Sequence, residues 1–170
     1  MAGDSGTTAI YMKAPFKGSV TAAGKVGWIR LLSLSFDATK QTHKEIGKDK
    51  EKNKKAATHG KFSEFTVTKR LDDASGELME KAAEGVVDQD DVDLEIVICQ
   101  TETAGRGTPR VYAHYYLYST VLSSYQIKGG SSGVLEEIKI AYDWVEMDYV
   151  PHSPNNANAA ATRISYQSNA

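Results

Sequence analysis

The amino-acid sequence alternates between apolar and polar residues with a period of two over much of its length. In residues 27–36, four large apolar side chains would share one face of an extended strand: Trp28, Leu32, Leu34 and Phe36. Similar alternation occurs at residues 9–13, 62–70, 91–100, 110–118, 121–128 and 134–150. Such alternation is typical of strands that bury one face. About eight strands at short spacing with one helix predict an antiparallel β-barrel or sandwich, and because the strands do not alternate with helices, a parallel α/β fold is disfavoured.

Residues 75–84 carry the signals of one short helix. Ser75 or Asp73 can accept the free backbone N–H groups of a first turn, and Glu77 lies near the positive end of the helix dipole. Gly85 suits the left-handed cap that ends many helices. A helix of about ten residues is marginal alone, so we expect it to dock on the sheet.

Residues 40–58 differ in kind from the rest of the chain. Ile46 is their only large aliphatic residue, so this segment cannot pack a core. A connection of this length inside a compact domain indicates an extended loop with a function of its own, or a simple solvated loop. We consider it a candidate contact between subunits or rings, through its seven lysines: Lys40, Lys44, Lys48, Lys50, Lys52, Lys54 and Lys55.

Charge is unevenly distributed along the chain. Residues 40–55 carry seven lysines against three acidic residues, a net charge of +4, whereas residues 72–95 carry ten acidic residues against one lysine, a net charge of −9. Four aspartates represent the candidate complementary acidic surface: Asp88, Asp90, Asp91 and Asp93. Opposite patches on identical subunits can meet in a heterologous contact, which builds rings or filaments. The alternative is that these charges neutralise one another within one subunit.

No set of residues is spaced for catalysis or metal binding. The chain has four histidines and one cysteine: His43, His59, His114, His152 and Cys99. None of the histidines lies at zinc-ligand spacing from another or from Cys99, and we expect this thiol to be buried and unreactive. The aspartate cluster lacks the glycine and the final glutamate of an EF-hand loop. We therefore predict a protein that is not an enzyme and needs no cofactor or metal.

The length of 170 residues predicts one β domain over residues 1–151, followed by a polar tail at 152–170 with a short edge strand at 163–167. A net charge of −2 requires neither nucleic acid nor an anionic membrane as a partner. No stretch approaches the ~18 uninterrupted apolar residues of a membrane helix, and residues 1–8 lack the pattern of a signal peptide. We thus expect no membrane insertion and synthesis in the cytoplasm.

Several short motifs, taken in order, resemble the haemolysin-coregulated protein (Hcp) family of type VI secretion systems. The first are Ile-Tyr-Met-Lys at residues 10–13, Gly-Trp-Ile at 27–29 and Leu-Ser-Leu-Ser-Phe at 32–36. Phe-Thr-Val-Thr-Lys at residues 65–69, the turn at 129–133 and Asp-Tyr-Val-Pro at 148–151 follow. The resemblance implies an antiparallel β-barrel with one helix. It also implies homohexameric rings that stack into a tube inside a contractile sheath, behind a spike tip protein.

The resemblance further implies that sheath contraction expels the tube from the bacterial cytoplasm, so that the protein is secreted without a signal peptide. The lumen of the rings can carry small effectors. By strand alternation, Ser33 and Ser35 lie opposite the apolar face of their strand, and Ser35 resembles a cargo-contacting position. The alternative is an ordinary solvent-facing pair of serines. An alternative function for the whole chain is a free-standing binding or adhesin-like β domain.

Overall fold

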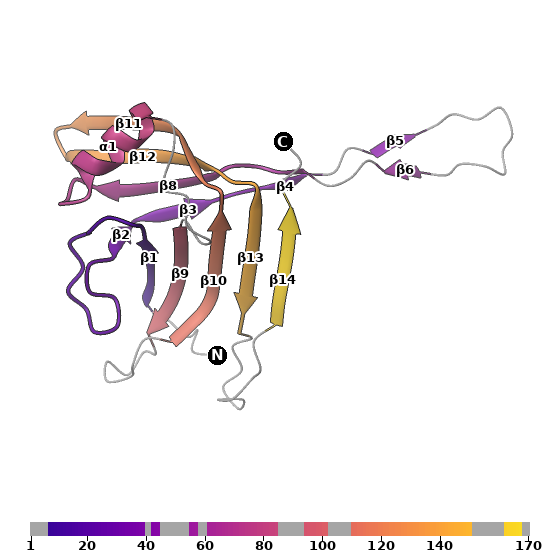
Figure 1. Ribbon diagram of the computed structural model, residues 1–170, viewed down its shortest axis with the longest axis horizontal. Coiled ribbons are helices and arrows are strands. Elements are labelled where there is room, and N and C mark those ends of the chain that lie inside the picture. The colour runs from indigo at the N-terminus through magenta and orange to yellow at the C-terminus, as the bar shows by residue number, and fades with distance from the viewer. Residues whose placement is uncertain are drawn as a thin grey trace, which may run out of the picture.

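The computed structural model describes residues 7–39, 42–44, 55–57, 61–84, 94–101, 110–150 and 162–167. These residues form strands β1 to β14 and one helix, α1 (Figure 1). All strand pairs are antiparallel. The predicted fold class, a mainly β antiparallel barrel with one helix, is confirmed.

Six strands form the larger sheet, in the order β14-β13-β10-β9-β1-β2. Their bounds are β1 Thr7–Lys13, β2 Ile29–Leu31, β9 Leu94–Thr101, β10 Arg110–Tyr118, β13 Trp144–Tyr149 and β14 Thr162–Gln167. Four strands form the smaller sheet, in the order β11-β12-β8-β3. Their bounds are β3 Ser33–Ser35, β8 Phe65–Arg70, β11 Val121–Gly130 and β12 Gly133–Ala141. Figure 1 shows the four-stranded sheet running crosswise over one end of the six-stranded sheet.

The chain passes directly from one sheet to the other at three corners. β2 continues into β3 through Leu32, whose N–H donates to the carbonyl of Thr68 at 2.7 Å. β10 continues into β11 through Ser119, which has a φ of 52°, a value that few residues other than glycine adopt. β12 continues into β13 through Asp143, whose N–H donates to the carbonyl of Tyr118 at 3.1 Å. These corner strands connect the two sheets into a barrel.

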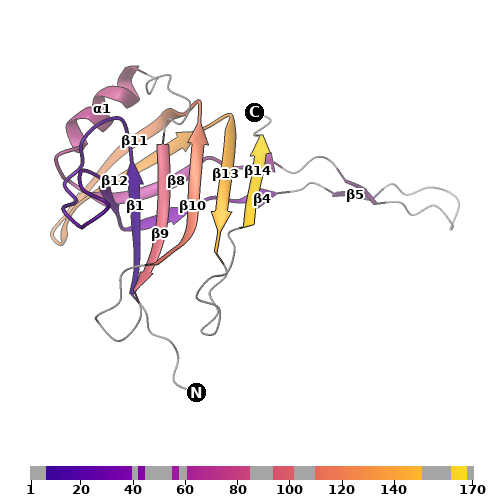
Figure 2. The ribbon, with the colours of Figure 1, turned by 60° about the horizontal axis from the view of Figure 1, so that its bottom comes forward.

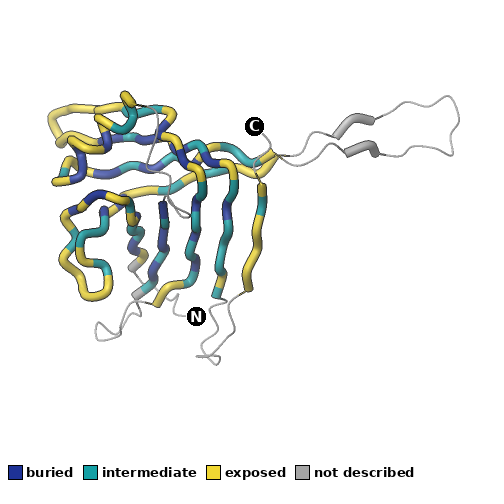
Figure 3. The backbone as a smooth tube through the Cα atoms, viewed as in Figure 1, coloured by how far each residue is buried: buried dark blue, intermediate teal, exposed yellow. Residues whose placement is uncertain are grey.

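The core lies between the two sheets and is apolar and aromatic. Phe65 is fully buried and stacks on Phe36 with ring centroids 4.5 Å apart, and Tyr115 and Tyr142 meet it edge-on. Burial alternates along β8, as the sequence pattern predicts (Figure 3). The other fully buried apolar side chains include Met12, Ile29, Leu78, Leu94, Ile96, Leu117, Ile138 and Ile140.

The predicted face of residues 27–36 is wrong in part. Before the corner at Leu32, Ile29 and Leu31 are the buried residues, whereas after it Leu34 and Phe36 pack on the core. The corner thus shifts the alternation by one residue. Leu32 itself is 49% exposed, and Trp28 packs on the opposite side of the six-stranded sheet with Val97 and Cys99.

Helix α1 spans Ser75–Glu84, as predicted, and docks on the four-stranded sheet through the buried Leu78. Its first turn is bonded differently from the prediction. The Asp72 carboxylate accepts the N–H of Ala74 at 3.0 Å, while the Ser75 hydroxyl accepts the N–H of Asp72 at 2.9 Å. Asp72, and neither Asp73 nor Ser75, therefore caps the free N–H groups before the helix.

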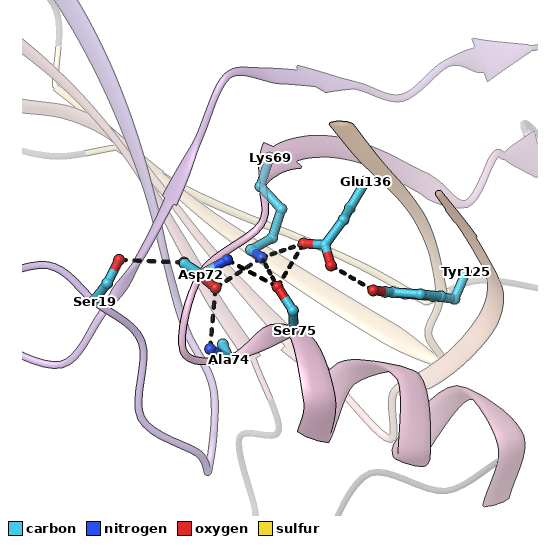
Figure 4. A network of polar contacts seen from close by, with 7 residues as sticks. All are labelled: Ser19, Lys69, Asp72, Ala74, Ser75, Tyr125 and Glu136. Carbon is cyan, nitrogen blue, oxygen red and sulfur yellow. Dashed lines mark hydrogen bonds and ion pairs between the residues drawn. The ribbon is translucent and has the colours of Figure 1, made fainter. Parts of the chain in front are cut away.

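A network of charged and polar side chains fixes this helix start to the sheet (Figure 4). Lys69 on β8 and Glu136 on β12 are fully buried, directly opposite each other, and form an ion pair. Lys69 also pairs with Asp72 at 2.8 Å and donates to Ser75 at 3.0 Å. The Tyr125 hydroxyl donates to Glu136. Its pKa is raised, mainly by burial and secondly by the nearby Glu136 carboxylate. Every charge in the network thus has a partner, as burial requires.

A narrow ribbon leaves the barrel between β3 and β8. Its root pairs β4, Ala38–Thr39, with β7, Lys61–Phe62. Further out, β5, Thr42–Lys44, pairs with β6, Lys55–Ala57, and Figure 1 shows this pair well apart from both sheets. The predicted extended loop at 40–58 thus contains a pair of strands. Its residues 40, 41, 45–54 and 58 lie outside the described residues.

We expect replacement of Lys69 by Met to destabilise the protein by about 3–5 kcal/mol, because it leaves the buried Glu136 carboxylate without its cation. The double variant Lys69→Met/Glu136→Met should be more stable than Lys69→Met, because it removes the fully buried carboxylate and leaves only Asp72, which reaches solvent, without its cation. Urea unfolding followed by circular dichroism measures both. The control is Lys81→Met, which removes a surface pair with Glu84 and should cost under ~1 kcal/mol. Equal costs for Lys69→Met and the control would contradict the role of the network.

Candidate assembly surfaces

The outward side of the four-stranded sheet carries short polar side chains. Ser33 and Ser35 on β3 are both exposed and point away from the core. Ser33 lies opposite Thr68 with their hydroxyl oxygens 2.6 Å apart, and Ser35 lies opposite Thr66. We call the following set the polar face: Ser33, Ser35, Thr66, Thr68, Ser124, Gln126, Glu137 and Lys139. Its hydroxyl and amide groups donate and accept hydrogen bonds, so this face suits contact with water.

An open groove of about 440 Å³ lies at one end of this face, beside the turn between β11 and β12. It combines the exposed apolar side chains of Leu32, Val134 and Leu135 with the cations of Arg70 and Lys128. Lys128 is paired with Glu137 at 2.6 Å. The groove is the structural consequence of the Leu32 corner, which turns that side chain outward.

The outward side of the six-stranded sheet carries a ladder of polar contacts across its strands. Glu95 on β9 pairs with Lys13 on β1 at 2.8 Å and with His114 on β10 at 3.0 Å. At the far edge, Arg163 on β14 binds both carboxylate oxygens of Asp148 on β13, at 2.7 and 2.8 Å. Burial raises the pKa of Glu95, but Lys13 and His114 outweigh it, so that this pKa is lowered overall.

His114 is half-buried within this ladder. Its Nε2 faces Glu95, and its Nδ1 lies 3.0 Å from the hydroxyl of Tyr116, whose ring stacks on the imidazole. Burial lowers the pKa of His114, and the carboxylate of Glu95 opposes this only in part. His114 therefore links β10 to β9 through its contact with Glu95.

A small apolar cluster lies beneath the aromatic part of the same side. Ala9, Val97 and Cys99 are buried there under Tyr11 and Trp28. Two cations cover these rings: Arg30 lies 4.9 Å from the Tyr11 centroid and Lys25 lies 4.4 Å from the Trp28 centroid. Burial raises the pKa of the Cys99 thiol, which disfavours its nucleophilic thiolate form.

The structure locates only part of the two charged segments. Lys44 and Lys55 lie opposite each other in β5 and β6. The remaining candidates lie outside the described residues: Lys40, Lys48, Lys50, Lys52, Lys54, Asp88, Asp90, Asp91 and Asp93. In the described part of the acidic region, the exposed carboxylates are Asp73, just before α1, and Glu77, Glu80 and Glu84 on α1. The pairing of the two segments across subunits stays a prediction.

Sequence reasoning found the serines of the polar face but missed their neighbours. Thr66 and Thr68 could have been found from the alternation of residues 65–69, and Lys139 from that of residues 134–141. Over the ranges that the structure describes, no three His, Cys, Asp or Glu side chains are grouped to hold a metal ion. The described helix is too short and too polar to cross a membrane.

Comparisons with known proteins agree on one family. Residues 10–149 match the family described as "Type VI secretion system effector, Hcp". The fold is similar to that of a type six secretion system protein, with a TM-score of 0.70 at 25% identity over 95% of this chain and 96% of that one. Hcp1 from Salmonella typhimurium gives 0.67 at 15% identity over 94% of each chain. A type VI secretion system effector from Yersinia pestis gives 0.65 at 15% identity, over 93% and 98%. No curated protein sequence matches the chain.

We expect mild acid to destabilise the protein through His114. Because the pKa of His114 is lower in the folded state than in the unfolded chain, its contribution is complete above about pH 6.5 and is lost as the pH falls below that value. Urea unfolding at pH 7.5 and 5.5 should therefore show a larger loss for the wild type than for His114→Gln, which can still donate to Glu95. Glu95 and Asp148 do not interfere, because their lowered pKa values place their loss below about pH 4.5. Equal losses in both proteins would contradict this assignment.

Proposed function

Because the chain belongs to the Hcp family of type VI secretion proteins, we propose that it is a structural subunit of the secretion tube. Six copies form a ring, and rings stack into an inner tube. Contractile sheath proteins surround this tube and a spike protein tips it. Sheath contraction expels it from the bacterial cytoplasm, with small effectors in its lumen. The observation that carries this proposal is the family match at residues 10–149, which spans every strand from β2 to β13.

The polar face of the four-stranded sheet lines the lumen in this proposal. A wall that lets polypeptide slide past needs side chains that water can solvate and that offer few apolar anchors. The polar face meets this need, because it is built mainly of hydroxyl and amide groups and its two charges, Glu137 and Lys139, are opposite in sign. The outward side of the six-stranded sheet has large aromatic rings instead. Ser33 and Ser35 thus become lumen residues that contact cargo.

Stacking of rings uses the charged ends of the subunit. In Figure 1, α1 and the β5–β6 pair lie at opposite ends of the molecule. The exposed side of α1 is acidic, and residues 40–55 are rich in lysine. A head-to-tail stack would bring such ends of successive subunits together, and their attraction would guide correct encounter.

Size-exclusion chromatography with light scattering tests the ring directly. We expect a mass six times that of one chain at tens of micromolar protein, and negative-stain images of rings with a central hole. The free-standing binding domain predicts a monomer under the same conditions. A monomeric protein with an intact fold by circular dichroism would therefore contradict the tube and favour that alternative.

A gold-labelled cysteine tests which face lines the lumen. Ser35→Cys, treated with a maleimide-gold cluster, should show density inside the central hole of the ring. Ser165→Cys is the matched control, because Ser165 is exposed on the outward side of the six-stranded sheet opposite Glu146. The native Cys99 is only 2% exposed and should stay unlabelled. Density from Ser35→Cys at the rim of the ring would overturn the assignment.

A further inference from the structure

The β4–β7 pair, the root of the ribbon, is too small to fix the direction in which the ribbon leaves the barrel. It consists of two residue pairs, Ala38 with Phe62 and Thr39 with Lys61. An isolated two-stranded ribbon of this size is not stable in water, so its direction depends on what it packs against. Phe62 is the one large apolar side chain among these four residues, and it is partly buried against the core. The surroundings of Phe62 therefore decide where the ribbon points.

Phe62 is held from two sides. On the core side its ring stacks on Phe36 at a centroid distance of 6.3 Å. On the other side Tyr166 of β14 meets it edge-on at 4.1 Å, which is the closer of the two contacts. Figure 1 and Figure 2 both show β14 beside the root of the ribbon. The last strand of the sheet thus reaches a segment about one hundred residues earlier in the chain.

The neighbouring backbone is fixed at the same place. The N–H of Ser63 donates to the Asp37 carbonyl at 2.8 Å, and the N–H of Asp37 donates to the Ser63 hydroxyl at 2.7 Å. The Tyr142 hydroxyl donates to the Ser63 carbonyl at 3.1 Å. Burial, and to a lesser degree Tyr166, raises the pKa of Tyr142 to about 12. Tyr142 and Tyr166 thus both contact the root, at Ser63 and Phe62.

β14 is itself attached in a way that leaves the core independent of it. It pairs with β13 through six residue pairs, and Arg163 binds Asp148 on the outward side. Its residues are exposed except for Tyr166, which is partly buried. An edge strand with so little buried surface belongs to the least stable part of a fold. It can therefore loosen without unfolding the barrel.

We infer that β14 is a clamp that holds the root of the β4–β7 ribbon in one direction, with Tyr166 as its positioning residue. The clamp sets the angle at which the β5–β6 pair leaves the barrel. This last step rests on the proposed function: if the ribbon joins successive rings, the clamp places it for that contact.

Hydrogen exchange of single backbone amides tests the clamp. In Tyr166→Ala we expect exchange at Ser63 and Asp37 to speed up about tenfold, the scale of losing one buried aromatic pair. The amide of Val67 in the core should keep its wild-type rate. Tyr166→Phe retains the ring and should restore slow exchange. Ile164→Ala is the matched control, because Ile164 lies on the same strand but is 55% exposed.

The results that overturn the clamp are specific. Unchanged exchange at Ser63 in Tyr166→Ala would show that β14 does not hold the root. Faster exchange at Val67 as well would show that Tyr166 merely supports the whole core. Light scattering and electron microscopy of Tyr166→Ala then separate this inference from the proposed function, since we expect intact rings in shorter stacks. If the wild type forms no rings, the proposed tube function is wrong. The exchange result at Ser63 and Asp37 still tests whether β14 holds the root.

Discussion

A fully buried lysine and glutamate determine how α1 packs on the four-stranded sheet. Lys69 and Glu136 face each other across β8 and β12, and neither can stay charged in an apolar interior without partners. At the start of α1, Asp72 pairs with Lys69 and the Ser75 hydroxyl donates to Glu136. From the other side, Tyr125 of β11 also donates to Glu136. The placement of the helix, and the cover it gives to the sheet, thus follow from satisfying two buried charges.

The strands and the helix could largely be predicted from the sequence, because each depends on a local pattern. Alternation along residues 65–70 and the capping signals around residue 75 are readable without a structure. The corner at Leu32 could not be predicted from the sequence, because Gly27 to Phe36 has the pattern of one continuous strand. The bend depends on a hydrogen bond to the carbonyl of Thr68, which is distant in the chain. The burial of Lys69 was missed for the same reason: its partner is 67 residues away.

Alternation along the sequence predicts which way a strand side chain points, but it predicts no contact partner for the surface. Ser33 and Ser35 point outward, because they alternate with Leu34, which packs on the core. Residues 40–58 and 85–93 contain too few apolar residues for any period to place them. The family was recognisable from the order of several weak motifs spread over the chain. The contact between Tyr166 and Phe62 could not be foreseen, because nothing local to β14 indicates which segment it meets.

The buried pair also discriminates between alignments of the strands. If β8 slid by two residues along β12, every side chain would keep its face, and most of the apolar burial would survive. Lys69 would then lie opposite Ile138 or Val134, and the fully buried Glu136 would lose the cation across from it. Apolar contacts alone tolerate such a slip, whereas a charge that has a single matching position does not. The ion pair therefore adds an energetic penalty to misaligned sheets that the hydrophobic pattern alone would accept.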